Sequence, residues 1–264
     1  MSWQAALPMY NVSSRLGRAY EKLLAAWLAQ AGVADDVAIA RDVALPDFWT
    51  RPDMLVSQTC GYPYIATLHG KVALLATPCH ELPGCTGSDY ASAMIVRADR
   101  GIATLDQARG LVAAVNDRHS NSGMNLLRHA VAPLARDGRF FGDVKWSGSH
   151  AASVHMVREG AADIAAIDCV TFAYLRQEDP AAVAGLAVLQ YSAAAPGLPL
   201  IAGGNVPEAW VTRLRGALLA PGPALLATMR PLRIAAFRHC DAAAYGRIGQ
   251  LEALARQWGY AALA

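Results

Sequence analysis

The chain has 264 residues, of which 54% are hydrophobic and 17% charged, and its formal net charge is +2. This composition supplies a sizeable core and excludes a disordered chain, and the small charge argues against nucleic acid or an anionic membrane as partner. The length suits one large domain or two closely linked lobes. Because the net charge is small, any binding site for an anion must come from a local group of residues.

Short β-type runs alternate with helical patterns along most of the chain, which is typical of α/β folds with parallel strands. In the first part we expect strands over 3–9, 37–43, 54–57, 71–77 and 90–96. A helix after the first of these would have an apolar face formed by Leu16, Tyr20, Leu23, Leu24, Trp27 and Leu28.

The middle of the chain predicts a compact β-α-β-α-β-α set. Its strands are expected over 111–115, 143–146 and 163–167. Its helices are expected over 123–134, over 151–158 and from Val170 onward. After a further strand at 186–191, the pattern becomes largely helical, over 207–219, 223–229 and 241–260.

No linker rich in Ser or Pro separates two independent domains. Two lobes joined by crossing strands explain this better, with crossings near 90–94 and 191–199. We therefore expect residues 1–93 to form the first part of lobe 1 and residues 94–190 to form lobe 2. Residues 191–264 are expected to return to lobe 1 and to supply the C-terminal helices.

Three polar turns follow predicted strands, each directly before a helix. They are Ser57-Gln58-Thr59, Ser120-Asn121-Ser122-Gly123 and Ser147-Gly148-Ser149-His150. Ligands of open α/β sheets bind at this edge, where helix starts present unpaired N–H groups and about half a positive charge. Such turns suit a phosphate, phosphonate, sulfate or carboxylate. Ordinary helix capping, which also selects Ser, Thr and Asn, is the alternative for each turn.

Two segments carry a family resemblance: VNDRHSNSGMNLLRHAVAPL, and FFGDVKWSGSHAASVHMVREGAADIAAIDCVTFAYL. They resemble the second lobe of phosphonate-type substrate-binding proteins of ABC importers. The pieces LPMYN, SQTCGYPY and DYASAMIVRAD are similar to first-lobe segments of that family. The resemblance implies the two-lobed type II periplasmic-binding fold, with two α/β lobes and two crossing strands. It also implies capture of a small anion between the lobes and an ABC permease as partner.

The resemblance also implies roles for individual residues. Tyr10 and Tyr90 would wall the pocket, and Ser120, Asn121 and Ser122 would form the anion turn. His150 would donate to the anion. Asp168 would face the amine of a zwitterionic ligand. With Ser57, Gln58, Thr59, Gly123 and Ser149 from the polar turns, these residues form the expected ligand-binding set. Packing by the tyrosines and capping by Asp168 are the alternatives.

The sequence gives little support to an enzymatic function. Neither a G-x-S-x-G elbow, a P-loop, an H-E-x-x-H motif nor a dinucleotide fingerprint occurs in the sequence. One enzyme alternative is a cytosolic enzyme similar to those of menaquinone biosynthesis, which share this fold and act on small carboxylates. His150 or Asp168 would then be the base. A stand-alone sensor that binds a small anion is a third hypothesis. Of the three, we favour the transport-type binding protein.

The five cysteines are an odd, scattered set, which suggests reduced thiols. Cys79, His80 and Cys85 share one loop but lack a second ligand pair at zinc spacing. A surface loop is favoured, and a Cys79–Cys85 disulfide is the alternative in an exported protein. Neither a cofactor nor a metal is expected.

The first residues, MSWQAALPMYNVSSRLG, show no signal peptide, and no stretch reaches the roughly 18 apolar residues of a membrane helix. The family resemblance predicts a periplasmic protein. A cytoplasmic location is expected if the sequence as written is complete.

Overall fold

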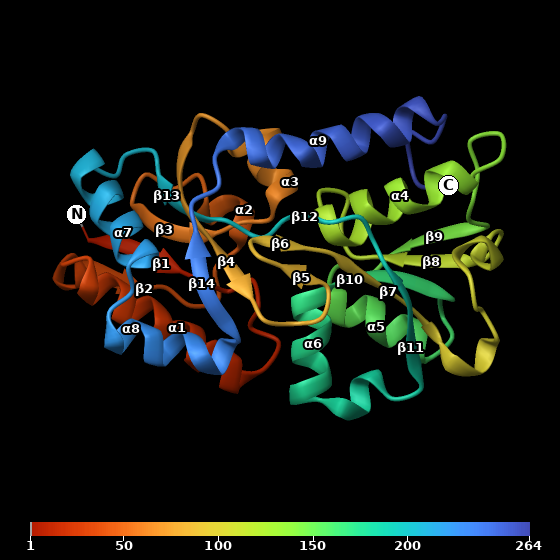
Figure 1. Ribbon diagram of the computed structural model, residues 1–264, viewed down its shortest axis with the longest axis horizontal. Helices are drawn as coiled ribbons and strands as arrows, with labels where there is room; N and C mark the ends of the chain where they lie inside the picture. Colours follow the sequence, from red (N-terminus) through yellow and green to blue (C-terminus); the bar gives the residue numbers. More distant parts are fainter. Residues whose placement is uncertain (1) are drawn as a thin grey trace. The chain divides into compact units, whose positions relative to one another are not determined.

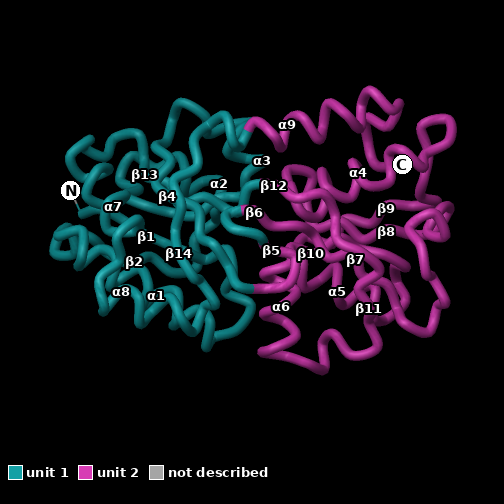
Figure 2. The backbone as a smooth tube through the Cα atoms, in the orientation of Figure 1, with its two compact units in different colours: residues 1–81, 86–88, 196–245 teal, residues 82–85, 89–195, 246–264 magenta. Residues whose placement is uncertain are grey.

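The structure is a computed structural model that describes residues 2–264. The chain divides into two compact units, which Figure 2 shows in different colours. Unit 1 comprises residues 1–81, 86–88 and 196–245, and unit 2 comprises residues 82–85, 89–195 and 246–264. Each unit combines helices with a β-sheet, which confirms the α/β prediction.

Unit 1 contains a six-stranded sheet in the order β14-β4-β13-β3-β1-β2. Its strands are β1 (Trp3–Ala6), β2 (Val37–Ile39), β3 (Met54–Gln58), β4 (Val72–His80), β13 (Leu200–Gly203) and β14 (Ile234–Arg238). β1 is parallel to β2 and β3, whereas β13 is antiparallel to β3 and β4, and β14 is antiparallel to β4. The continuous burial of β3 explains its run of apolar residues, since both faces of this strand are covered.

The helices of unit 1 follow the predicted apolar pattern. They are α1 (Ser14–Gln30), α2 (Leu45–Phe48), α3 (Gly61–Pro63), α7 (Glu208–Leu219) and α8 (Pro223–Met229). Ser13 caps α1 by accepting a hydrogen bond of 3.2 Å from the Leu16 N–H. The six residues predicted for the apolar face of α1 are all buried, and α1 packs against α7 and α8 (Figure 1).

Unit 2 contains a five-stranded sheet in the order β11-β7-β10-β8-β9. Its strands are β7 (Ser92–Arg97), β8 (Val112–Val115), β9 (Asp143–Trp146), β10 (Ile164–Asp168) and β11 (Leu186–Tyr191). β8, β9 and β10 are mutually parallel, whereas β7 is antiparallel to β10 and β11. Helices α4 (Leu126–Val131) and α5 (His150–Arg158) cover opposite faces of this sheet, and α6 (Cys169–Glu178) follows β10 (Figure 1).

The chain passes from one unit to the other near the two predicted crossings. A small third sheet, in the order β12-β6-β5, is formed by β5 (Cys85–Thr86), β6 (Asp89–Tyr90) and β12 (Ala195–Pro196). The passages at 88/89 and 195/196 fall in or beside these strands. Further passages at 81/82 and 85/86 bound the short stretch 82–85, and one at 245/246 lies within α9 (Ala242–Gln257). None of these three has a counterpart in the sequence prediction.

Three features differ from the sequence-based expectation. The region after residue 191 contains strands β13 and β14, although we expected it to be largely helical. The sheets are mixed rather than parallel, because β7 is antiparallel to both its neighbours in unit 2 and β13 and β14 are antiparallel to theirs in unit 1. Residues 246–264 belong to unit 2, whereas the sequence interpretation returned 191–264 to lobe 1. No helix within residues 2–264 is both long enough and apolar enough to cross a bilayer.

Candidate functional site

The polar turn after β8 is the centre of the candidate site. Ser120 caps it by accepting a hydrogen bond of 2.9 Å from the Gly123 N–H, and residues Asn121–Asn125 form a π-helical turn. Ser120, Asn121 and Ser122 are all buried. π-Helical turns are rare and are frequent at functional sites, because they change the direction in which side chains and N–H groups point. This turn therefore does more than start a regular helix.

The second polar turn meets the first through a side-chain hydrogen bond. Ser122 Oγ lies 2.8 Å from Nε2 of His150, the first residue of α5. Burial of the imidazole lowers the pKa of His150 from 6.5 to about 4, so the ring is neutral at pH 7. The other ring nitrogen, Nδ1, is buried and has no hydrogen-bond partner among residues 2–264. A buried polar atom without a partner is costly, and a ligand would supply one.

Gly123 allows two further groups to approach this turn. A Cβ atom at Gly123 would overlap the Asn116 side chain and would lie 3.2 Å from Cε1 of His150. Asn116 directly follows β8, and its Oδ1 is also buried without a partner among the described residues. The absence of a side chain at Gly123 thus brings two unsatisfied polar atoms, Asn116 Oδ1 and His150 Nδ1, to the same turn.

A network of buried hydrogen bonds holds the turn Ser120–Gly123 in place. Asn121 Nδ2 donates to the Tyr90 hydroxyl at 3.1 Å, and Asn125 Nδ2 donates to Asn121 Oδ1 at 3.0 Å. Arg128 then donates to Asn125 Oδ1 at 2.7 Å and lies 3.4 Å from a carboxylate oxygen of Glu252 in α9. This chain of bonds fixes the orientation of Asn121, because each member holds the next.

Two other contacts position the turn within unit 2. Ser92 Oγ, from β7, donates to the carbonyl oxygen of Ser122 at 2.9 Å. The Arg118 guanidinium lies 4.4 Å from the centre of the Trp146 ring, so it joins the loop after β8 to the end of β9. The Gly148 N–H also donates to the Asn116 carbonyl at 3.0 Å. The loops after the neighbouring parallel strands β8 and β9 are therefore bound to each other.

Ser149 and Asp168 act as helix caps in this structure. The Ser149 hydroxyl accepts from the Ala152 N–H at 3.1 Å at the start of α5, and Ser149 is exposed. Asp168 is buried, and its Oδ1 accepts from the N–H groups of Val170 and Thr171 at 2.8 and 3.0 Å. Both arrangements match the capping alternative raised by the sequence. They leave a ligand role for either residue as a proposal.

The remaining expected residues lie in unit 1. Tyr10 is buried and packs against Tyr20 and edge-on against His80, with ring centres 6.2 and 5.8 Å apart. Burial lowers the pKa of His80 to about 4.

The turn of Ser57, Gln58 and Thr59, also in unit 1, ends β3 and is buried. Its hydrogen bonds stay within unit 1. Gln58 Nε2 donates to the Leu198 carbonyl at 3.2 Å, and Thr59 Oγ1 donates to the Cys60 carbonyl at 3.1 Å. Gln58 Oε1 is buried without a hydrogen-bond partner among the described residues.

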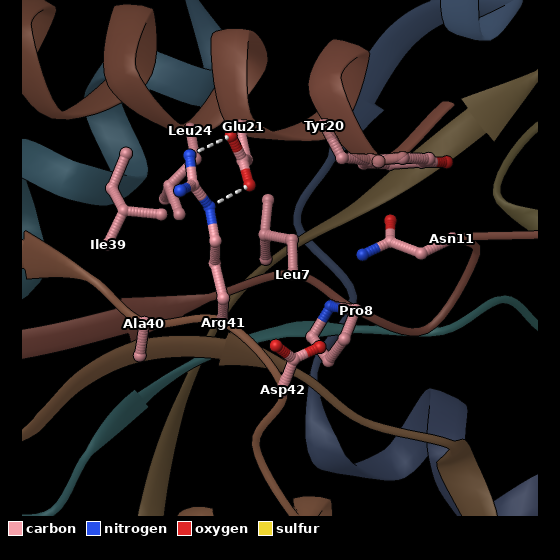
Figure 3. Close-up of a pocket in the computed structure, with 11 residues that line it drawn as sticks. Leu7, Pro8, Asn11, Tyr20, Glu21, Leu24, Ile39, Ala40, Arg41 and Asp42 are labelled. Carbon is pink, nitrogen blue, oxygen red and sulfur yellow. Dashed lines mark hydrogen bonds and ion pairs between the residues drawn. The ribbon is translucent and has the colours of Figure 1, made fainter. Parts of the chain in front are cut away.

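A separate cavity of about 140 Å³ lies in unit 1, beside α1 (Figure 3). It contains none of the expected ligand-binding residues. Its one arginine, Arg41, is held by Glu21 through two hydrogen bonds of 2.7 and 2.8 Å, which Figure 3 draws as dashed lines. Because Glu21 already neutralises this cation, the cavity is a poor site for an anion.

No group of three potential metal ligands gathers within residues 2–264. Cys79 and His80 are buried at the end of β4, so they do not lie in the surface loop that the sequence suggested. None of the five cysteines is in a disulfide.

The structure brings together Tyr90, the turn 120–123 and His150, and it places Ser149 and Asp168 at the starts of the helices that follow β9 and β10. Sequence reasoning missed Asn116, Ser92, Asn125 and Arg128. Asn116 could have been found, because it is the first polar residue after the predicted strand 111–115, in the loop that leads to the polar turn. The other three had no local signal, since their partners are distant in the chain.

Comparison with known proteins, like the geometry of the polar turns, points to a protein that binds a small anion. A family model described as "ABC transporter, phosphonate, periplasmic substrate-binding protein" matches residues 53–245. No curated protein matches the chain. Among solved structures, a binding-protein component of an ABC phosphonate transporter from Pseudomonas aeruginosa is 18% identical, with a TM-score of 0.79. That match covers 98% of this chain and 87% of the other.

Two further structures show the same fold. PhnD1 from Prochlorococcus marinus, in complex with methylphosphonate, is 15% identical with a TM-score of 0.77, and the match covers 96% of this chain and 97% of that one. A protein from Xanthomonas citri bound to ATP is 19% identical with a TM-score of 0.68, and the match covers 98% of both chains. These likenesses confirm the expected two-lobed binding-protein fold.

Proposed function

The protein belongs to the family of periplasmic substrate-binding proteins of phosphonate ABC transporters, and we propose that its turn Ser120–Gly123 binds the anionic head of a phosphonate or phosphate. The family consists of transport proteins that bind a substrate, so the enzyme alternative is not favoured. The observation that carries the proposal is the Ser122–His150 pair, beside which His150 Nδ1 and Asn116 Oδ1 are buried without hydrogen-bond partners in the described part of the chain, residues 2–264.

The chemistry of these groups suits a tetrahedral oxyanion. Serine hydroxyls and the N–H groups of a helix start donate to anionic oxygens, and a neutral imidazole has one N–H to donate. The acceptor Asn116 Oδ1 would receive the proton of a monoprotonated phosphonate, which carries one P–OH group. Charge-assisted hydrogen bonds contribute about 1.5–3 kcal/mol each, so several of them give useful affinity without lysine or arginine in the turn.

We propose further contacts for the rest of the ligand. Tyr90, Gly123 and Ser149 would line the anion site in unit 2, and Asp168 would face a cationic group of a zwitterionic phosphonate. Tyr10, Ser57, Gln58 and Thr59 are proposed as the ligand contacts that unit 1 supplies. The unpaired Gln58 Oε1 supports such a role for the turn after β3.

We also propose that the protein works in the periplasm with an ABC permease as its partner. The family description supports this location and this partner. Cell fractionation with an antibody against the protein tests the location, and co-purification with the membrane components of a transporter tests the partner. Recovery in the cytoplasmic fraction alone would contradict the proposed location.

Isothermal titration with methylphosphonate, inorganic phosphate, sulfate and acetate tests the ligand class. We expect methylphosphonate or phosphate to bind most tightly, and Ser120→Ala with Ser122→Ala to weaken that binding at least tenfold. Ser13→Ala is the matched control, because it also removes a capping hydroxyl but lies at the start of α1. Equal binding by the double variant and the wild type would show that the anion site lies elsewhere.

A further inference from the structure

Two cysteines that are distant in the sequence are neighbours in unit 2. Cys85 Sγ lies 3.4 Å from Cys169 Sγ, although the two residues are 84 positions apart in the chain. Cys85 belongs to β5 and is half-buried, whereas Cys169 is buried as the first residue of α6. Cys169 also directly follows Asp168. Neither thiol takes part in the anion site proposed above.

Close backbone packing holds the two thiols together. Gly84 has φ +88°, and a Cβ atom there would lie 2.8 Å from Cys169 Cβ and 2.8 Å from Cε1 of Tyr191. Only glycine has room and conformational freedom at this point, so the segment before Cys85 rests directly on the start of α6. The proximity of the sulfur atoms is therefore built into the packing and does not depend on two flexible side chains meeting by chance.

We propose that Cys85 and Cys169 form a disulfide when the protein meets a disulfide oxidant, such as a thiol–disulfide oxidoreductase. A disulfide bond is about 2.05 Å long, so the sulfur atoms need to approach by only about 1.3 Å. The two thiols lose two protons and two electrons, and the oxidant's disulfide takes up both and is reduced to two thiols. This step does not depend on the ligand of the protein.

The order of the two exchange steps follows from exposure. The pKa of the Cys169 thiol is raised by its hydrogen bond with Cys85, by burial and by the nearby Asp168 carboxylate. Cys85, which is the more exposed thiol, attacks the oxidant as its thiolate and forms a mixed disulfide. Cys169 then attacks the Cys85 sulfur, and the oxidant leaves as a thiol.

Other pairings are disfavoured by where the cysteines lie. The short spacing of Cys79 and Cys85 suggests a local disulfide, yet Cys79 is buried in β4, where it pairs with Ala236 of β14. Cys240 lies 3.4 Å from the Ser88 hydroxyl. Oxidising compartments such as the periplasm are where a bond between Cys85 and Cys169 would form and persist.

The bond would fasten residues 82–85 to the start of α6, next to Asp168. It would also close a long loop in the unfolded chain, which raises stability. Oxidation should therefore raise the melting temperature of the wild type by about 5–10 °C relative to the reduced protein. The Cys85→Ser variant should melt at the same temperature with or without the oxidant, whereas Cys240→Ser should keep the wild-type difference.

Mass spectrometry of the wild-type protein gives the decisive measurement. The folded protein is treated with oxidised glutathione or with dithiothreitol, alkylated under denaturing conditions and digested without reduction. We expect a Cys85–Cys169 linked peptide pair after oxidation only. Alkylation of both residues after oxidation, a Cys79–Cys85 link, or glutathione retained on Cys85 would overturn the proposal. Methylphosphonate titration of the reduced protein tests the anion site separately, so the two proposals can fail independently.

Discussion

Ser122 and His150 are 28 positions apart in the chain, yet Ser122 Oγ and His150 Nε2 share a hydrogen bond of 2.8 Å. Each residue lies at the start of a helical segment, and these segments follow the neighbouring parallel strands β8 and β9. Parallel neighbours end at the same edge of a sheet, so the two helix starts are brought together by the pairing of the strands. The proposed anion site thus depends on the register of β8 and β9.

The stability of the ligand-free protein should depend on pH through His150. Its pKa is about 4 in the folded protein and 6.5 in an ordinary histidine, so the unfolded chain binds more protons between these values. Stability should therefore be complete above pH 6.5 and fall as the pH decreases toward 4. The loss per histidine is at most on the order of 3 kcal/mol, and less for the half-buried His150 than for His80.

Urea unfolding between pH 4 and pH 7 tests this expectation. The His150→Gln variant should lose part of the pH dependence and keep the part that comes from His80, whose pKa is also lowered to about 4. A slope identical to that of the wild type would show that His150 is not held neutral by burial.

Gly123→Ala should damage both folding and binding. The added methyl group would overlap the Asn116 side chain and crowd the His150 ring. Overpacking of this kind costs about 1–3 kcal/mol, and any relief would move Asn116 away from the turn. We expect a lower melting temperature and weaker methylphosphonate binding.

Gly216→Ala is the matched control for that substitution. Gly216 lies within α7, and a Cβ atom there would meet nothing within 4 Å. Alanine is the better helix former by up to about 1 kcal/mol, so this variant should be slightly more stable and bind normally. Similar behaviour of the two variants would contradict the steric role assigned to Gly123.

Asp168→Asn should weaken the binding of phosphonates that carry an amine more than the binding of those that do not. Asparagine keeps a side-chain oxygen that can accept from the N–H groups of Val170 and Thr171, so α6 remains capped. The lost negative charge should weaken binding of 2-aminoethylphosphonate by about tenfold or more and leave ethylphosphonate nearly unchanged. Titration calorimetry with this matched pair measures the difference. Equal losses for both ligands would assign Asp168 a structural role only.

Arg128→Met should loosen residues 246–264 from unit 2. Arg128 is buried, lies 3.4 Å from Glu252 and donates to the Ala261 carbonyl at 2.9 Å. Methionine would leave the buried acceptor Asn125 Oδ1 and the Ala261 carbonyl without this donor, which we expect to cost about 1–3 kcal/mol, while Glu252 keeps its ion pair with Arg256. Arg256→Met removes the exposed partner of the same Glu252 and should cost less than about 1 kcal/mol.

Hydrogen exchange provides the local measurement for Arg128. The amides of residues 246–264 should exchange faster in Arg128→Met than in Arg256→Met. Unchanged protection in this segment would show that apolar packing alone holds it in place.

Local patterns predicted those parts of the fold that depend on nearby residues. The apolar face of α1 follows from the spacing of Leu16, Tyr20 and Trp27, and all three are buried. The polar turn 120–123 was predictable because Ser, Asn and Gly gather between an apolar strand and the helical pattern that follows it. The meeting of this turn with His150 followed from placing both turns at one sheet edge.

Features that depend on residues far apart in the chain could not be predicted from local sequence patterns. The strand β13 has only four residues, and it is stabilised by β3 and β4 on either side, which a local pattern does not reveal. The pairing of Arg128 with Glu252 places the end of the chain in unit 2, and neither residue indicates this alone. Cys85 gave a misleading signal, because Cys79 is nearer in sequence while Cys169 is the neighbour in space.

The contact of the Arg118 guanidinium with the Trp146 ring places a fluorescent side chain next to the proposed anion site. Trp146 is 41% exposed and immediately precedes the turn that ends at His150, while Arg118 immediately precedes the stretch His119–Gly123. Indole emission responds to the charge and solvent around the ring. If an anion binds at the proposed site, we expect the charge around this pair to change and the Trp146 emission with it, so that binding can be followed by fluorescence without attaching a dye.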